Sequence, residues 1–351
     1  MLIPATAKIR VLIVDDSASM RMHIRSVLSA DYAIEVVGTA EDGVEAIDKV
    51  QLLKPEVITM DVDMPRLDGI AALRVIMATA PASKVVMLSS LTHKGAKTTF
   101  DALEAGAFDF VPKNADGFEA EILSKIKQAA RSNHGRVIAT QPEAASPARA
   151  VSAISLKGKR ISVVGIGAST GGPVALQEVL SHIPANFPHG IFIAMHMPKA
   201  FTGVYAERTN SKCAITVREA EDGELLKPGV ALIAPGGMHA TLVRQGGGIM
   251  VKTHPVSDYP QYNYIPSVDL MISSMAEACG GTALGVILTG MGSDGFKGMQ
   301  QLKQKGGVTI VQDEATSTIY GMPKACVIGG VADEVLPLTQ IGAEIARLAG
   351  G

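Results

Sequence analysis

Residues 8–16 read KIRVLIVDD, an apolar run that ends in two aspartates. A run of this length and composition is typical of a strand that is buried on both faces of a parallel sheet. Four more runs of the same kind follow before residue 112: EVVG (35–38), VITM (57–60), VVMLS (85–89) and FDFV (108–111). Helical periodicity separates the runs, for example at Met20, Ile24, Val27 and Leu28. Five strand–helix units in succession predict an α/β domain with a doubly wound parallel sheet.

The second half of the chain repeats this alternation. Its apolar runs are ISVVGIG (161–167), IFIAM (191–195), VALIA (230–234), ALGVILT (283–289) and VTIV (308–311). We therefore expect a second doubly wound, Rossmann-like parallel sheet. In TLVRQGGGIMVK (241–252) two short runs flank a set of glycines, which predicts that this sheet carries a local antiparallel hairpin.

The length of 351 residues predicts about two domains of roughly 100 to 200 residues each. Residues 133–157 are rich in Ala, Ser and Pro and have no sustained period, which is typical of a linker. We therefore expect an N-terminal domain over residues 1–132, a linker over 133–157 and a C-terminal domain over 158–351.

Charge and composition exclude several classes of protein. The 32 basic and 34 acidic residues give a net charge of −2, so the sequence predicts no nucleic-acid partner. We expect a cytoplasmic protein without membrane insertion, because the sequence shows no signal peptide and no apolar run of the roughly 18 residues that span a bilayer. The three cysteines form no C-x-x-C pair, which argues against a disulfide framework or a cysteine-rich zinc site.

Carboxylates follow two strands of the predicted N-terminal sheet. Asp15 and Asp16 follow the first strand, and Asp61 follows the third. The carboxyl ends of parallel strands share one rim, so the three groups should lie together. A single aspartate at a strand end can simply cap the next helix. Three carboxylates at one rim repel one another unless a hard cation joins them, so the pattern predicts a Mg²⁺ site.

The fourth and fifth strands bring a hydroxyl and an ammonium to the same rim, at Ser89 and Lys113, and Phe110 precedes the lysine. A hydroxyl and a lysine at this position could hold phosphoryl oxygens.

Over residues 8–130, the motifs VLIVDDSASMR, MDVDMPRLDG, MLSS and FVPK resemble the receiver domain of bacterial response regulators. The resemblance implies that Asp61 is the phosphorylated aspartate and that Asp15 and Asp16 bind Mg²⁺ with it. It further implies that Ser89 and Lys113 contact the phosphoryl group and that Phe110 is the switch aromatic. One departure is Asn114, which stands where the family usually has a proline. Cis peptide bonds occur almost only before proline, so Asn114 argues against the cis bond that the family pattern implies after Lys113.

The stretch GIGASTGGP (165–173) lies between a predicted strand and a predicted helix and allows three interpretations. A dinucleotide fingerprint fits poorly, because Thr170 occupies the third glycine position. A phosphate-binding P-loop does not fit, because Pro173 replaces the essential lysine. The third interpretation is a nucleophile elbow, G-x-S-x-G, which would present Ser169 at the end of its strand; a structural glycine turn remains the alternative.

A serine nucleophile needs a base and an acid that orients it. His196 directly follows the strand IFIAM, and His239 follows VALIA at a greater distance, so we prefer His196 as the base and keep His239 as the alternative. Asp294 lies in the glycine-rich loop after ALGVILT and is the best candidate for the orienting acid. The chain order Ser, His, Asp differs from the order Ser, Asp, His of the α/β-hydrolases.

The motifs GIGASTGGP, HMPKAFT, IAPGGMH, PSVDLM, ILTGMGSDG and YGMPKA resemble the chemotaxis protein-glutamate methylesterase (CheB) family over nearly the whole C-terminal half. The resemblance implies hydrolysis of glutamate methyl esters on the cytoplasmic helices of methyl-accepting chemoreceptors, together with deamidation of receptor glutamines. It places Thr170 and the backbone near Met291 in the oxyanion region. A departure is Ile265, where members often carry a basic residue.

The two resemblances together imply a phosphorylation-controlled hydrolase, with the chemotaxis histidine kinase as phosphodonor, Mg²⁺ needed for phosphorylation only, and an unphosphorylated receiver that inhibits the hydrolase. A signalling adaptor is the main alternative, but it would need neither the serine nor the histidine. A DNA-binding regulator is disfavoured, because the C-terminal half has no basic stripe and no helix-turn-helix pattern.

Overall fold

The computed structural model describes residues 8–132 and 160–350. The chain divides into two compact units, residues 1–140 and 141–351, and each is described by itself. The linker expected over residues 133–157 lies outside the described residues. Within the described ranges, no helix is both long enough and apolar enough to cross a membrane.

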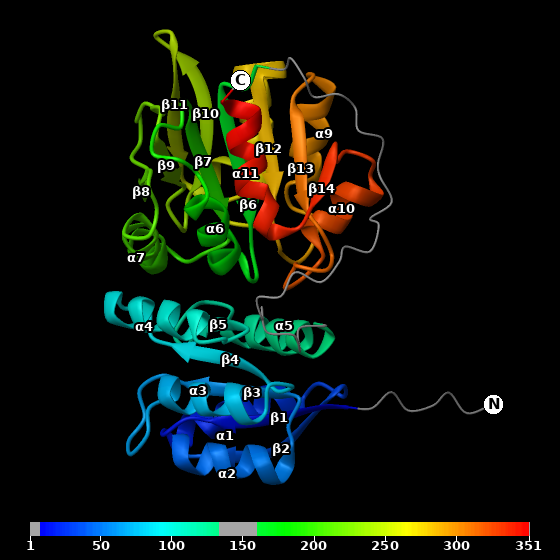
Figure 1. The fold of residues 1–351 in the computed structure, drawn as a ribbon. Helices are drawn as coiled ribbons and strands as arrows, with labels where there is room; N and C mark the ends of the chain where they lie inside the picture. Colours follow the sequence, from blue (N-terminus) through cyan, green and yellow to red (C-terminus); the bar gives the residue numbers. More distant parts are fainter. Residues whose placement is uncertain (1–7, 133–159, 351) are drawn as a thin grey trace, which may run out of the picture. The chain divides into compact units, whose positions relative to one another are not determined.

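The first unit contains one parallel sheet of five strands in the order β2-β1-β3-β4-β5 (Figure 1). The strands are β1 (Ile9–Val14), β2 (Ile34–Ala40), β3 (Val57–Asp61), β4 (Lys84–Ser89) and β5 (Asp109–Pro112). They correspond to the five apolar runs of the sequence. All residues of β3 and β5 are buried, as expected for strands covered on both faces.

Five helices cover the first sheet. They are α1 (Ala18–Ser29), α2 (Gly43–Leu53), α3 (Gly69–Thr79), α4 (His93–Glu104) and α5 (Phe118–Arg131). Helix α1 packs against α5, whereas α3 packs against α2 and α4, so the helices form two layers. Four of the helices begin at a side-chain cap, because Ser17, Asp42, Asp68 and Thr92 each accept a hydrogen bond from a backbone amide of the first turn.

The second unit contains a parallel sheet of seven strands in the order β14-β13-β12-β6-β7-β9-β8. The strands are β6 (Val163–Ala168), β7 (Gly190–Met195), β8 (Thr216–Glu219), β9 (Val230–Ile233), β12 (Ala283–Ile287), β13 (Val308–Gln312) and β14 (Glu334–Leu336). The chain leaves β6 towards β7 and later returns to β12 on its other side. This change of direction beside β6 is the position at which doubly wound sheets bind their ligands.

Helices lie on both faces of the second sheet (Figure 1). They are α6 (Gly172–Ser181), α7 (Lys199–Asn210), α8 (Val268–Cys279), α9 (Phe296–Gln304), α10 (Met322–Ile328) and α11 (Leu338–Ala349), with short 3₁₀ turns at Val256–Asp258 and Gly280–Thr282. Helix α6 packs on α11, and α9 packs on α8 and α10. The two doubly wound parallel sheets predicted from the sequence are therefore confirmed.

The predicted hairpin is also present, but it is not part of the parallel sheet. Strands β10 (His239–Gln245) and β11 (Gly248–His254) form a separate two-stranded antiparallel sheet, and β11 has one further antiparallel bridge, from Met250 to Leu225. Gly246 and Gly247 both have positive φ at the turn, which favours the tight turns of two-residue hairpins. The hairpin packs against α8 through β10, and its apolar side chains Leu242 and Val251 join the same hydrophobic core as α8.

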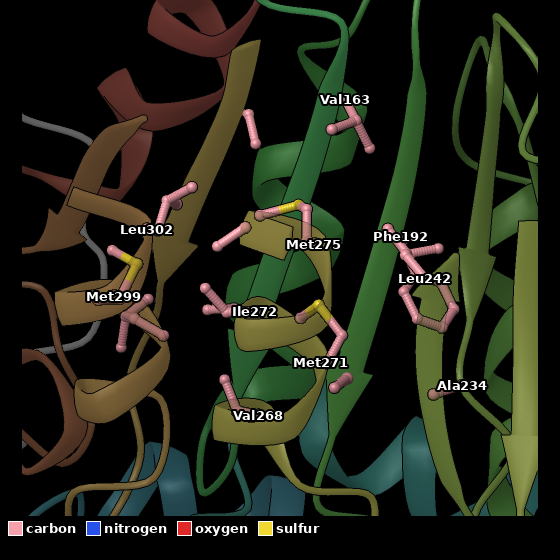
Figure 2. Packing of buried hydrophobic residues seen from close by; sticks show 14 of the residues in the cluster. Val163, Phe192, Ala234, Leu242, Val268, Met271, Ile272, Met275, Met299 and Leu302 are labelled. Carbon is pink, nitrogen blue, oxygen red and sulfur yellow. The ribbon is translucent and has the colours of Figure 1, made fainter. Parts of the chain in front are cut away.

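Helix α8 is the centre of the hydrophobic core of the second unit (Figure 2). Its buried face presents Val268, Met271, Ile272 and Met275. Val163 and Phe192 meet them from β6 and β7, and Met299 and Leu302 from α9. A side chain at Gly167 in β6 would place its Cβ only 2.2 Å from Val268 Cγ1. The glycine therefore allows the N-terminus of α8 to lie directly against the end of β6.

Candidate active site and acidic site

Three polar side chains follow three adjacent strands of the second sheet. Ser169 follows β6, His196 follows β7, and Asp294 lies in the loop after β12. Strand β6 is paired with β7 on one side and with β12 on the other. The sheet topology alone therefore brings the three residues to one rim.

Asp294 is buried, with 5% of its surface exposed, and it receives several hydrogen bonds. Backbone amides of the first turn of α8 donate to it, Val268 N over 2.7 Å and Asp269 N over 2.9 Å. Burial by itself raises the pKa of Asp294. The hydrogen bonds from His196 and from the helix amides outweigh burial and lower the pKa below its ordinary value. The helix N-terminus thus holds Asp294 as a carboxylate.

The imidazole of His196 connects this carboxylate to the serine. Its Nε2 lies 2.8 Å from Asp294 Oδ2, and its Nδ1 lies 3.0 Å from Ser169 Oγ. A carboxylate can only accept hydrogen bonds, so the proton of the first pair belongs to Nε2. Nδ1 is then free of a proton and can accept the hydrogen bond of the Ser169 hydroxyl. This arrangement is the one that a base needs in order to take the serine proton.

His239, the alternative base, occupies a different position. It is fully buried, and its Nδ1 accepts a hydrogen bond from Ser267 N over 3.2 Å. Burial lowers the pKa of His239, which favours the neutral ring. The histidine that contacts Ser169 is therefore His196, and His239 instead supports the segment that leads into α8.

The turn that carries Ser169 differs from a strained nucleophile elbow. Ser169 is not in the left-handed region; the positive φ of this turn, +76°, belongs to Gly171. Ser169 N donates to Thr289 O over 3.0 Å, and Gly172 N donates to Ser169 O over 2.6 Å. These bonds fix the turn between β6 and α6 without strain at the serine itself.

The two residues expected in the oxyanion region lie on the loops beside Ser169. Thr170 is buried, and its carbonyl accepts from Thr289 Oγ1 over 3.0 Å. Met291 is 44% exposed. The carbonyl of Gly290 accepts from Gly321 N and Met322 N at the start of α10, which fixes the loop that presents Met291. The part of Thr170 and Met291 in binding an oxyanion stays a prediction.

The acidic residues of the first unit also meet. Asp15, Asp16 and Asp61 each offer a carboxylate oxygen within 4.8 Å of the other two. Lys113 joins two of them, since its Nζ lies 2.8 Å from Asp15 Oδ2 and 2.6 Å from Asp61 Oδ2. Three carboxylates in this arrangement are the donor set that Mg²⁺ prefers.

The titration of this acidic site reflects its burial. Burial raises the pKa of Asp61, although Lys113 works against the shift. Burial also opposes the charge of Lys113, but the bonds to the two carboxylates prevail and raise the pKa of its ammonium.

Ser89 and Phe110 lie on the neighbouring strands. Ser89 is at the end of β4 and is 1% exposed, and its hydroxyl has no hydrogen-bond partner among the described residues. Phe110 is buried in β5.

The two departures from the family patterns have different backbone geometry. Among the described residues the single cis peptide bond joins Ile265 to Pro266, so the bond between Lys113 and Asn114 is trans. Ser267 was not among the predicted site residues, although its hydroxyl donates to Asp294 Oδ1 over 3.1 Å. The pattern PSVD is typical of a serine N-cap and could have indicated it. Tyr264, whose ring stacks on His196, was not predicted either, and the sequence carries no comparable signal for it.

The folds and the geometry of both sites define a receiver-type unit and a second, doubly wound α/β unit that carries a serine, histidine and aspartate site. Residues 11–128 match the model of the response regulator receiver domain, and residues 164–345 match that of the CheB methylesterase. The chain therefore belongs to the CheB methylesterase family. Its methylesterase unit is accompanied by a receiver domain.

Known relatives agree with this assignment over the full length. The chain is 61% identical to protein-glutamate methylesterase/protein-glutamine glutaminase 1 of Geobacter sulfurreducens, with 100% of both chains covered. It is 60% identical to protein-glutamate methylesterase/protein-glutamine glutaminase 5 of Geobacter metallireducens, with 98% of each covered. The crystal structure of the Thermotoga maritima CheB methylesterase catalytic domain matches with a TM-score of 0.52 and 40% identity, and covers 54% of this chain and 98% of that one.

Proposed function

We propose that the second unit hydrolyses the γ-methyl esters of glutamate side chains on the cytoplasmic domains of chemoreceptors, with Ser169 as nucleophile, His196 as general base and Asp294 as the residue that orients His196. The hydrogen-bonded series from Ser169 through His196 to Asp294 is the observation that carries the proposal. Its members lie at the ends of three adjacent strands, where a protein substrate can reach a side chain more easily than in the sheet interior.

In the first half of the reaction, Ser169 Oγ attacks the ester carbonyl carbon while its proton passes to His196 Nδ1. The Asp294 carboxylate stabilises the imidazolium that forms, because it accepts the proton of Nε2 in a hydrogen bond of 2.8 Å. Backbone donors near Thr170 and Met291 face the negative oxygen of the tetrahedral intermediate. His196 then returns its proton to the methoxy oxygen, methanol leaves, and an acyl group remains on Ser169.

The second half repeats these steps with water. His196 takes a proton from the water, the hydroxide oxygen attacks the acyl carbon, and the proton returns to Ser169 Oγ as the glutamate carboxyl group is released. A glutamine side chain presents an amide at the same carbon. The same sequence of proton transfers then releases ammonia in place of methanol, which accounts for a glutaminase activity at one site.

For the first unit we propose phosphorylation of Asp61 by the chemotaxis histidine kinase. Asp15, Asp16 and Asp61 would hold a Mg²⁺ ion, which when bound offsets the negative charge that a phosphoryl group brings. Lys113 supplies a cation for the phosphoryl oxygens, and the Ser89 hydroxyl, which has no hydrogen-bond partner in the described part of the chain, supplies a donor. Phe110 lies on the neighbouring strand β5, and we propose that it changes position when Asp61 is phosphorylated. We propose that the protein acts in the cytoplasm, because the proposed receptor domains are cytoplasmic.

The proposed activity is tested with purified full-length protein and membranes that contain receptor methylated with a labelled methyl group. We expect labelled methanol to appear at a rate proportional to enzyme, and ammonia to appear when the receptor carries glutamines at the same positions. Release of neither product from receptor that a known methylesterase demethylates would contradict the proposal.

A further inference from the structure

A side chain outside the catalytic series lies flat against its central member. The ring of Tyr264 stacks on the imidazole of His196, with the ring centroids 4.6 Å apart and the planes 7° from parallel. Tyr264 lies in the segment before α8, and His196 directly follows β7, so the contact joins parts of the chain that are 68 residues apart. Neither the serine nor the aspartate needs this residue for its own hydrogen bonds.

The stack supplies a constraint that the hydrogen bonds of His196 do not. The bonds from Nδ1 to Ser169 and from Nε2 to Asp294 lie at the edge of the ring. Such bonds fix where the two nitrogens are, but they leave the plane of the ring free to tilt about the line between the partners. A parallel ring against its face removes this freedom, and proton transfer to Nδ1 depends on that alignment.

The contact also favours the charged form of the histidine that the reaction needs. His196 carries a positive charge from the time it takes the serine proton until it gives the proton to the leaving group. The face of an aromatic ring is negative, and a cation within about 6 Å of its centroid is attracted to it. The centroid distance of 4.6 Å is within this range. The attraction strengthens as charge develops, so it acts on the transition state more than on the ground state.

Burial alone does not explain why a tyrosine occupies this place. Tyr264 is 42% exposed, whereas the ring it covers belongs to a side chain that is only 12% exposed. The outer end of the tyrosine lies against Gly292, where an added Cβ would be 2.7 Å from Tyr264 Oη. Gly292 follows Met291 in the loop that leads to Asp294. The ring is thus held between His196 and this loop while its remaining surface faces solvent.

We propose that Tyr264 is a positioning residue for His196, which fixes the tilt of the imidazole through the stacked face and stabilises the imidazolium during proton transfer. This inference rests on the proposed function, because it assigns Tyr264 a part only through His196. The ring face acts, and the hydroxyl group is dispensable.

The test compares Tyr264→Leu and Tyr264→Phe in the full-length protein, with methanol release from labelled receptor as the assay. Leucine fills much of the same space without a π face, so kcat should fall about three- to tenfold while KM for the receptor stays within about twofold. Phenylalanine keeps the face and should restore kcat to within about twofold of the unchanged protein. Tyr32→Leu, at an 87% exposed position of the first unit, is the matched control and should change neither constant.

The outcomes distinguish a positioning role of Tyr264 from a role in receptor binding and from a role of its hydroxyl group. A Tyr264→Leu variant with unchanged kcat and a raised KM would show that Tyr264 binds the receptor instead, and would overturn the inference. Equal losses in the leucine and phenylalanine variants would assign the effect to the hydroxyl at Gly292 and overturn it as well. If Tyr264→Leu does not fold, Tyr264→Gln, whose polar side chain suits a part-exposed position, takes its place with the same expected loss. Absence of methanol release from the unchanged protein would instead contradict the proposed function itself.

Discussion

The hydroxyl of Ser267 donates a hydrogen bond of 3.1 Å to Oδ1 of Asp294, and Ser267 Oγ also caps α8, because it accepts a hydrogen bond from Leu270 N. One side chain thus contributes both to the stability of a core helix and to the position of the proposed orienting acid. The backbone amide of Ser267 donates in turn to His239. The buried His239 therefore contacts Ser267 and, through Ser267, supports the position of Asp294.

We expect Ser267→Ala to affect stability and activity together. Loss of the cap should lower the free energy of unfolding of the second unit by about 1 kcal/mol. Loss of the bond to Asp294 should lower kcat for ester hydrolysis about three- to tenfold. Urea unfolding and methanol release measure the two effects. Ser267→Thr keeps a hydroxyl and is the control; an alanine variant with unchanged kcat would show that the helix amides alone position Asp294.

Substitution of Asp61 should stabilise the first unit near neutral pH. Burial raises the pKa of Asp61 above its ordinary value of 3.8, so the folded state holds the proton more tightly than the unfolded chain does. The stability that such a group contributes is full below that ordinary value and is lost as the pH rises through the raised pKa. Asp61→Asn has no charge to bury, and Lys113 keeps Asp15 as its partner.

We therefore expect Asp61→Asn to raise the unfolding free energy of the fragment 1–140 at pH 7 by on the order of 1 kcal/mol in metal-free buffer. The gain should shrink as the pH is lowered towards 4. Asp63→Asn, at a carboxylate that is 69% exposed, is the control and should have little effect. A less stable Asp61→Asn fragment at pH 7 would mean that the ion pair with Lys113 outweighs burial.

Removal of divalent metal should prevent phosphorylation of the first unit and leave ester hydrolysis by the second unit unchanged. The acidic site lies wholly in the first unit, and Ser169, His196 and Asp294 offer no cluster of metal ligands among the described residues. A chelator should therefore prevent labelling of Asp61 by a phosphodonor while the fragment 158–351 continues to hydrolyse receptor esters at its usual rate. Excess Mg²⁺ should restore the labelling. Loss of ester hydrolysis by this fragment in chelator would require a metal-assisted mechanism.

Deletion of the receiver should raise the basal rate. The family resemblance implies that the unphosphorylated receiver inhibits the hydrolase, so the fragment 158–351 should hydrolyse receptor esters several-fold faster than the unphosphorylated full-length chain. Asp61→Asn should keep the full-length chain at its low rate in the presence of a phosphodonor. Initial rates of methanol release test both. A fragment no faster than the full-length chain would leave direct activation or receptor recruitment as the effect of phosphorylation.

The sequence predicted most of the strands because apolar runs and polar strand ends are local features. Five strands of the second sheet match predicted apolar runs, with ends that differ by one or two residues, whereas β8 (TVRE) and β14 (EVL) were not predicted. Both are short strands at the edges of the sheet, and neither is fully buried. The hairpin was predicted correctly as a local element, but its separation from the parallel sheet depends on packing against α8.

The residues of the candidate site also fall into those that the sequence could indicate and those that it could not. Ser169, His196 and Asp294 could be selected because each directly follows an apolar run or lies in the loop after one, and the topology of a parallel sheet brings such ends together. The amides of α8 that hold Asp294 and the ring of Tyr264 that covers His196 could not be selected. These contacts join segments that are far apart in the sequence, and no local pattern indicates that the segments meet.

In the proposed reaction Ser169 performs the attack on the ester, and the initial rate of methanol release from labelled receptor by purified Ser169→Ala tests this role. Alanine removes the attacking oxygen and leaves His196 and Asp294 hydrogen-bonded to each other, so the fold should persist. We expect the rate to fall at least about 10³-fold relative to the unchanged protein under the same conditions. A rate within a few-fold of the unchanged protein would contradict this role.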